Sequence, residues 1–432
     1  MKTLYCNADV LLRNDERYGV LKNAFVGVEN DRFCYVGTEM PQEPYDRKSD
    51  MHGKLIMPGL YNCHTHAPMV LLRGVGSGLP LDKWLFEAVF PIEDKLTPEL
   101  ISAGSDLAIA EMIAGGTVSF SDMYFFPAKT IESVLNAGMK ANISRPVQAF
   151  KPGDPGAQTR IRESIELYDA YHKAGNGRIL VDFCIHAEYT CNEETVAQYA
   201  ALCKERSGNM HIHLSETEKE HEECKAKYGK TPARWFYDLG AFDSRTFAAH
   251  CVTLEDDDMQ LLKEKNVSIV HNPTSNLKLG SGFAPITKYL QMGFNVALGT
   301  DGAASNNNLN MFEEMHLAGI IHNGYEKNAT AMNADTVLTM ATENGAVLQG
   351  REMCGRIEVG YHADFIAVDL DRPHLIPQLD LPALLVYSAG AEDVCLTVCD
   401  GKELYKNGEF HTIDFEKVRF EVNHAVKQLY CN

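Results

Sequence analysis

The 432-residue sequence predicts a TIM-type (β/α)8 barrel with a small β-sandwich domain that both termini form. Three observations support this fold class. The middle of the chain alternates short apolar strand candidates with helix-like segments of about 10 to 20 residues. Both ends carry strand patterns instead, and polar residues gather where the middle strands end. We therefore expect a barrel over residues 58–354 and a small domain from residues 1–57 plus 355–432.

The two ends of the chain share the same strand-and-turn pattern. Near the N-terminus, AFVGVENDRFCYVG alternates apolar and polar residues around a hairpin-like turn at Asn30 and Asp31. Near the C-terminus, Asp400-Gly401 and the Asn-Gly pair at 407–408 are tight-turn signals between apolar segments. Two β-rich ends that flank a long middle favour one small domain assembled from both.

The middle of the chain contains eight apolar strand candidates. Eight such units over roughly 300 residues match a barrel better than an open doubly wound sheet, although one sequence does not give the strand order. The segments between them, such as TVAQYAALCKERSG, have the i, i+3, i+4 apolar spacing of helices. The expected strands cover residues 60–66, 117–124, 140–147, 179–186, 209–216, 246–252, 267–273 and 295–302.

Side chains that bind metals or move protons lie at or near the ends of these strands. Barrel enzymes place their chemistry at the carboxyl ends of the strands, so these side chains should meet at one face. They are His64, His66, Arg145, His186, His213, His250, His271 and Asp301.

The pair His64-Thr65-His66 is the first candidate for metal binding. Residues two apart in a strand face the same side, which suits two imidazoles on one ion. An isolated HxH is weak evidence, but this one ends an apolar strand candidate. His213 is the next expected ligand, whereas His211 on the same face is expected to support the site or the core.

Asp301 follows the eighth strand and is the expected fourth ligand and a proton acceptor, although an isolated TDG is more often a turn. Glu216 stands three residues after His213, close to the metal without binding it, as a general acid and base would. His250 would orient or deprotonate the bound water; the alternative is a core histidine with satisfied hydrogen bonds.

Three imidazoles and one carboxylate suit one divalent ion, with zinc the first choice and iron or manganese also compatible. Such an ion lowers the pKa of bound water toward about 7. A two-metal site would call for a lysine near the end of the fourth strand, and ILVDFCIHAEY has none.

The overall charge restricts the partners. Forty basic against 59 acidic residues give a formal charge of -19, which repels nucleic acid and anionic membranes. The N-terminus has no signal-peptide core, and no stretch reaches the roughly 18 apolar residues of a membrane span. We expect a cytoplasmic protein with a small-molecule substrate. The sequence leaves open whether the protein forms a homo-oligomer.

At this point the sequence resembles the amidohydrolase superfamily, and within it the 5'-methylthioadenosine/S-adenosylhomocysteine deaminases. The resemblance covers nearly the whole chain. HxH and TDG mark only the superfamily, whereas the tract from Trp84 to Glu93 with HNPTSNLKL is more specific to this branch. The matching segments are MPGLYNCHTHAPMVLLRG, WLFEAVFPIEDKLT, HIHLSET, AAHCV, HNPTSNLKLGSGFAPI and LGTDGAASNN.

The resemblance implies an adenosine-type deaminase that uses metal-bound hydroxide at C6 of adenine, with metal ligands His64, His66, His213 and Asp301. Glu216 would protonate the ring, His250 and Asp301 would take the hydroxide proton, and ammonia would leave to give the inosine analogue. Its implied substrates are S-adenosylhomocysteine, 5'-methylthioadenosine, 5'-deoxyadenosine and adenosine. The implied substrate contacts are Glu93 to the ribose, His186 to the purine, Trp84 to the 5' substituent, Ser305 in the pocket, and Arg145 and Arg160 toward the ribose and the amino-acid tail.

One departure from the family affects the substrate. After His186 the family commonly has Ala-Pro-Tyr, and this chain has Ala-Glu188-Tyr189. A carboxylate at the mouth would repel the tail of S-adenosylhomocysteine, or it would face solvent, so the preferred 5' substituent stays open. The alternatives are a guanine deaminase or an amino- or chlorotriazine hydrolase of the same superfamily, and a non-catalytic barrel scaffold, which would have lost some ligands.

Overall fold

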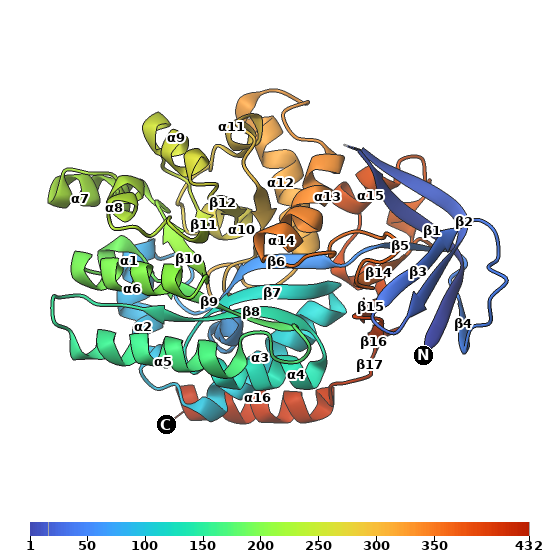
Figure 1. Cartoon of the computed structure of the whole chain (residues 1–432), viewed down its shortest axis with the longest axis horizontal. Coiled ribbons are helices and arrows are strands. Elements are labelled where there is room, and N and C mark those ends of the chain that lie inside the picture. The colour runs from blue at the N-terminus through green and yellow to red at the C-terminus, as the bar shows by residue number, and fades with distance from the viewer. Residues whose placement is uncertain (16, 432) are drawn as a thin grey trace.

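A computed structural model of the chain describes residues 1–15 and 17–431. Figure 1 shows a barrel surrounded by helices and, at one end, a second sheet in which blue N-terminal strands lie beside red C-terminal strands. The predicted fold class is therefore confirmed: a parallel eight-stranded barrel with a small β domain that both termini form.

The barrel strands follow one another in chain order, and every hydrogen-bonded neighbour pair is parallel. Their residues are almost all buried, which explains why they are continuous apolar runs. The last strand lies beside the first, where the Asp301 amide donates to the His64 carbonyl at 2.9 Å. The strands are β6 (Leu60–Thr65), β7 (Thr117–Met123), β8 (Lys140–Val147), β9 (Ile179–Ile185), β10 (Asn209–Leu214), β11 (Arg245–His250), β12 (Ser268–His271) and β13 (Val296–Leu298).

Helices cover the outside of the barrel (Figure 1). Many begin at a side-chain cap; for example, Thr97, Asn192 and Thr217 each accept a hydrogen bond from a backbone amide of the first turn. The helices are α3 (Pro98–Ala114), α4 (Pro127–Ala137), α5 (Pro155–Tyr171), α6 (Glu193–Glu205), α7 (Glu218–Tyr228), α8 (Pro232–Asp238), α9 (Asp256–Glu264), α10 (Pro273–Lys278), α11 (Ile286–Gln291), α12 (Met311–Glu326), α13 (Ala334–Ala341) and α14 (Glu343–Leu348).

Short helical segments follow the first and fourth barrel strands and lie near the mouth. They are η1 (Ala67–Leu72), α1 (Leu81–Lys83), the π-helix η2 (Trp84–Val89), α2 (Phe90–Glu93) and, after β9, η3 (Glu188–Thr190).

The terminal sheet contains nine strands in one hydrogen-bonded network. Strand β5 pairs with β14 and so joins the N-terminal to the C-terminal strands. The predicted turns are present, with Asn30, Asp400 and Asn407 at positive φ between paired strands. The strands are β1 (Lys2–Asn14), β2 (Arg17–Glu29), β3 (Arg32–Gly37), β4 (Arg47–Asp50), β5 (Lys54–Pro58), β14 (Phe365–Asp369), β15 (Val394–Cys399), β16 (Lys402–Lys406) and β17 (Glu409–Phe410).

The end of the chain leaves this sheet. Helix α16 (Phe415–Tyr430) packs on α3 of the barrel through Ala425 and Leu429, and Tyr430 donates to the Leu71 carbonyl at 3.0 Å. The predicted division at residues 58 and 355 stays a prediction. Residues 415–430, which it assigns to the small domain, pack against the barrel helix α3. Other helical segments of this half are η4 (Pro373–Leu375), α15 (Leu381–Tyr387) and η5 (Ala391–Asp393).

Among the described residues, none of the helices has the length and apolar character that crossing a membrane requires.

Candidate active site

Histidines from β6 and β10 meet at the carboxyl end of the barrel. The Nδ1 atom of His64 contacts Nε2 of His211 at 3.0 Å, and the buried Nε2 of His64 has no hydrogen-bond partner. Burial lowers the pKa of His64 to about 4, so the imidazole is neutral at pH 7. His64 therefore presents an unprotonated Nε2 lone pair to the centre of the mouth once its Nδ1 proton is donated to His211.

His66 and His213 are oriented in the same way. The Nδ1 atom of His66 donates to the Met123 carbonyl at 2.8 Å, and that of His213 donates to the His186 carbonyl at 2.7 Å. The two Nε2 atoms lie 3.3 Å apart. Although burial opposes protonation, the hydrogen bond to the Asp301 carboxylate raises the pKa of His66 to about 9, so a cation bound here would replace this proton. Nitrogens this close are placed to share one cation, since metal binding displaces the protons of its ligands.

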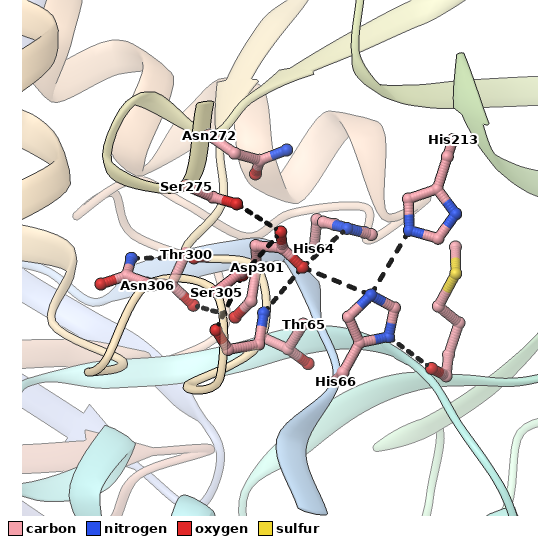
Figure 2. A network of polar contacts seen from close by, with 12 residues as sticks. His64, Thr65, His66, His213, Asn272, Ser275, Thr300, Asp301, Ser305 and Asn306 are labelled. Carbon is pink, nitrogen blue, oxygen red and sulfur yellow. Dashed lines mark hydrogen bonds and ion pairs between the residues drawn. The ribbon is translucent and has the colours of Figure 1, made fainter. Parts of the chain in front are cut away.

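Asp301 completes the cluster from the loop after β13. Its Oδ1 atom lies 3.4 Å from Nε2 of His64 and 3.3 Å from Nε2 of His66. Its Oδ2 atom accepts from the hydroxyls of Ser275 at 2.6 Å and Ser305 at 2.9 Å. Figure 2 shows the carboxylate between these hydroxyls and the imidazoles.

These donor atoms fit a divalent metal ion. One ligand atom each from His64, His66 and Asp301 lies within 4.8 Å of the others, and the same holds for His64, His213 and His250. The orphaned Nε2 of His64 is a buried polar atom that a metal ion would satisfy. Neutral imidazoles with a carboxylate are a ligand set that zinc prefers, and iron or manganese also accept it.

Left-handed backbone turns place the reactive side chains at the strand ends. Ser215, His250 and Asp301 have φ angles of 47°, 73° and 61°. Side chains other than glycine rarely adopt this region, and strained positions of this kind cluster at functional sites.

Glu216 and His250 face one another beside the metal cluster. The Oε2 atom of Glu216 lies 3.7 Å from Nε2 of His250, and its Oε1 atom accepts from the Ser281 hydroxyl at 3.3 Å. Burial raises the pKa of Glu216 to about 7, which keeps a proton available near neutral pH. The Nδ1 atom of His250 donates to the Asn276 side chain at 2.8 Å, which leaves its Nε2 free to accept a proton.

The cavity above the cluster contains three of the predicted substrate contacts. Trp84, Glu93 and His186 all line it. Glu93 accepts from the Tyr124 hydroxyl at 2.6 Å, and burial raises the pKa of its carboxyl. The rest of the wall is mainly apolar and includes Met69, Leu81, Leu85, Val89, Phe90, Phe125 and Leu279.

The other predicted substrate residues lie behind the cavity wall. Arg145 pairs with Glu163 of α5 at 2.8 Å and lies over the Phe125 ring, whereas the next residue, Pro146, lines the cavity. Arg160 donates to the backbone carbonyl of the cavity residue Gln148 at 3.1 Å. Ser305 lies against the Asp301 carboxylate rather than in the cavity lining.

Glu188 is neither at the mouth nor in solvent, contrary to both alternatives that the sequence left open. Glu188 is 2% exposed and does not line the cavity, whereas its neighbours His186 and Tyr189 do line it. The carboxyl faces inward because η3 turns it toward α7. A repulsion between Glu188 and a substrate carboxylate is therefore excluded as a source of specificity.

Sequence reasoning missed the residues that hold the reactive groups in place. Ser275 and Asn276 contact Asp301 and His250, and Ser281 contacts Glu216. All three lie shortly after β12, in HNPTSNLKLGS. A run of small polar residues directly after a barrel strand is the signal that indicates such a supporting role.

Comparison with known proteins identifies the protein family. The Amidohydrolase family model matches residues 55–404. The chain therefore belongs to the amidohydrolase family, whose metal-dependent hydrolysis agrees with the cluster of imidazoles and carboxylate.

Individual relatives within this family have high identity to the chain over nearly its full length. The chain is 43% identical over 433 residues to a 5-methylthioadenosine/S-adenosylhomocysteine deaminase of Acetivibrio thermocellus, covering 99% of this chain and 100% of the relative. It is 41% identical over 428 residues to a 5'-deoxyadenosine deaminase of Methanosarcina mazei, covering 98% of each. An adenosine deaminase structure from Xanthomonas campestris with bound zinc superposes with a TM-score of 0.94 at 31% identity, covering 100% of this chain and 99% of the other.

Proposed function

We propose that this chain is a metal-dependent aminohydrolase that converts adenine nucleosides with 5' substituents to the inosine analogues and ammonia. The candidate substrates are S-adenosylhomocysteine, 5'-methylthioadenosine, 5'-deoxyadenosine and adenosine. The names of near-full-length relatives support the substrate class. The observation that carries the proposal is the convergence of three imidazole Nε2 atoms and one carboxylate beside a buried acid, Glu216.

We assign one divalent metal ion to His64, His66, His213 and Asp301. Zinc is the first choice because the ligands are neutral imidazoles and one carboxylate, and iron or manganese are the alternatives. When bound, such an ion makes hydroxide available from water at neutral pH. The outward hydrogen bonds of the Nδ1 atoms would hold each imidazole in the tautomer that ligation requires.

The protons are assigned to three side chains. Glu216 donates its proton to a ring nitrogen of adenine, which makes C6 a better electrophile. The water that adds at C6 loses two protons: His250 and Asp301 accept one and transfer it to the amino group, and the other restores the proton of Glu216. The C6–N bond then breaks, ammonia leaves with the transferred proton, and the ring carries a carbonyl. The hydrogen bond from Nδ1 of His250 to Asn276 supports this role, because it leaves Nε2 as the acceptor.

The cavity supports a nucleoside with an uncharged 5' group. Glu93 would bind the ribose hydroxyls, His186 the purine, and Trp84 the 5' substituent. Among the described residues that line the cavity, none is a lysine or arginine, and Arg145 already pairs with Glu163. A substrate carboxylate would lack a partner there, so we expect 5'-methylthioadenosine and 5'-deoxyadenosine to be preferred over S-adenosylhomocysteine. Self-association and a cytoplasmic location stay predictions from the sequence.

The test is ammonia release by purified protein of known metal content. S-adenosylhomocysteine, 5'-methylthioadenosine, 5'-deoxyadenosine, adenosine and guanine are assayed in parallel at equal concentrations. Fast release from an uncharged 5'-substituted nucleoside supports both the reaction and the preference. Faster release from S-adenosylhomocysteine overturns the preference alone, and release from guanine only, or from none, overturns the substrate class.

A further inference from the structure

Two segments of the chain meet at the Asp301 carboxylate. Asp301 lies in the loop after β13, and Ser305 of the same loop donates to its Oδ2 atom at 2.9 Å. Ser275 of α10, the helix after β12, donates to the same oxygen at 2.6 Å. Figure 2 shows Ser275 reaching the carboxylate from a separate segment. The direction of Oδ1, which faces His64 and His66, therefore depends on how these two segments lie against each other.

A buried carboxyl of α12 contacts both segments. Glu314 is completely buried, and its Oε2 atom accepts from the Thr274 amide in the first turn of α10 at 3.2 Å. Its Oε1 atom accepts from the side-chain amide of Asn306 at 2.6 Å. The same Asn306 nitrogen donates at 2.8 Å to the carbonyl of Thr300, the residue directly before Asp301. Glu314 therefore connects the start of α10 to the loop that carries Asp301.

The contact with Thr274 takes the place of a helix cap. The first amides of a helix have no partner within it, and the N-cap side chain usually accepts from one of them. The N-cap residue of α10, Asn272, makes no such hydrogen bond. Helix α12 does not need Glu314 for its own start, because Asn310 accepts from two amides of its first turn. The Glu314 carboxyl thus serves the neighbouring segments rather than its own helix.

We propose that Glu314 is a positioning residue: it holds α10 against the loop after β13, so that Ser275 orients the Asp301 carboxylate toward the histidines. This inference rests on the proposed function, in which Asp301 is a metal ligand, and adds a residue to it. Glu314 does not line the cavity, so it acts through other side chains. Burial raises the pKa of its carboxyl to about 8, and an apolar side chain would avoid this cost of burial.

The physical consequence of losing the carboxyl is a loss of alignment at Asp301. The N–H groups of Thr274 and Asn306 would lose their shared acceptor, and a shift toward other acceptors would move Ser275 away from Asp301. Residues that support metal ligands typically contribute about 10- to 100-fold in metal affinity or activity. KM should change little, because the side chains assigned to substrate binding follow other strands.

The experiment compares two substitutions that differ in the number of acceptors. Glu314→Met keeps the side-chain length without an accepting oxygen, and Glu314→Gln keeps one of the two. The measurements are the rate at which the zinc-loaded protein loses its metal to a chelator, and kcat and KM for 5'-methylthioadenosine. We expect Glu314→Met to lose zinc about 10-fold faster and to lower kcat by about 10-fold, with KM unchanged. Glu314→Gln should lie between this variant and the unchanged protein.

The matched control is Glu313→Met, the preceding residue in the same first turn. Its carboxylate accepts from Asn308 instead and contacts neither Thr274 nor Asn306. It removes the same negative charge from the start of α12, and it should keep both the slow metal release and the full kcat.

A double-mutant cycle with Ser275→Ala identifies the group through which Glu314 acts. If Glu314 positions Ser275, then Glu314→Met causes a smaller loss in the Ser275→Ala protein than in the unchanged protein. Independent, multiplicative losses, or metal release and kcat that both stay unchanged in Glu314→Met, overturn the inference. Where Glu314→Met does not yield folded protein, Glu314→Gln is measured in the same cycle with the same outcomes.

The two proposals fail in different ways. If Asp301→Ala keeps stoichiometric metal, the ligand assignment in the proposed function is wrong. If Asp301→Ala loses its metal while Glu314→Met keeps both its metal and its kcat, only the inference about Glu314 is wrong.

Discussion

Two buried clusters of charged and polar side chains lie at opposite ends of the barrel strands, and they are built differently. At the amino end of β8, the ammonium of Lys140 lies 2.6 Å from oxygens of both Asp364 and Asp400. Asp400 also pairs with Arg178 at 3.1 Å and His362 at 2.9 Å. These contacts connect the barrel to the terminal sheet. In this cluster each carboxylate faces a positively charged or N–H donor group.

At the carboxyl end, ligand atoms converge instead. The Nε2 atoms of His66 and His213 approach each other, and that of His64 has no hydrogen-bond partner. Removing one partner from a cluster of neutralised charges destabilises the fold. Side chains whose ligand atoms converge on one point are suited to bind a cation. Substitutions in the two clusters should therefore separate stability from activity.

The largest effect on activity is expected at Asp301. Asp301→Ala removes a proposed metal ligand and a proton acceptor together, so turnover should fall to the background of the assay and the purified protein should lose its metal. Metal analysis and ammonia release measure both. Stoichiometric metal in Asp301→Ala would contradict the ligand assignment.

Glu216→Gln is expected to have the next largest effect. The amide keeps the shape but has no acid proton, so turnover should fall by about 10² to 10⁴, the usual range for a general acid and base. The metal content should match that of the unchanged protein, which distinguishes this group from Asp301. Full turnover would remove Glu216 from the mechanism.

At the other cluster, Lys140→Met should act on stability instead. The substitution leaves Asp364 and Asp400 buried without their ammonium partner, and breaking a buried pair costs about 3 to 5 kcal/mol of unfolding free energy. Denaturant unfolding of the metal-loaded protein measures this change. The control is Lys129→Met, whose pair with Glu132 lies at the surface and is worth at most about 1 kcal/mol.

Below its unfolding transition, Lys140→Met should retain metal and turnover. A loss of metal from the folded variant would show that the two clusters are coupled. The separation of stability from activity between them would then be wrong.

The smallest effect is a pH dependence. Burial raises the pKa of Glu216 to about 7, and the proposed role requires the protonated acid. The ratio kcat/KM should therefore be flat below pH 7 and fall by up to about tenfold per pH unit above it, as the proton is lost. The residual activity of Glu216→Gln should lack this limb. A rate that rises through pH 7 would contradict an acid role.

Much of the fold was accessible from the sequence because it depends on local patterns. Seven of the eight barrel strands lie within the predicted segments, and β11 begins one residue earlier, at Arg245. Strands buried on both faces appear as continuous apolar runs, which makes them easy to find. His64 and His66 face one side because strand residues alternate with period two. The same alternation gives the reason why Arg145 does not line the cavity: its neighbour Pro146 does.

The sequence by itself determined the barrel class, the polar residues at the ends of its strands and the residue types that suit a metal cluster. Tertiary structure alone decided which side chains support them: Asn276 contacts His250, Ser275 contacts Asp301 and Ser281 contacts Glu216. It also buried Glu188, which the sequence left at the mouth or in solvent. It also placed α16 on the barrel. The physical reason is that residue spacing fixes the face a side chain occupies, whereas its partner depends on how separate strands and helices pack together.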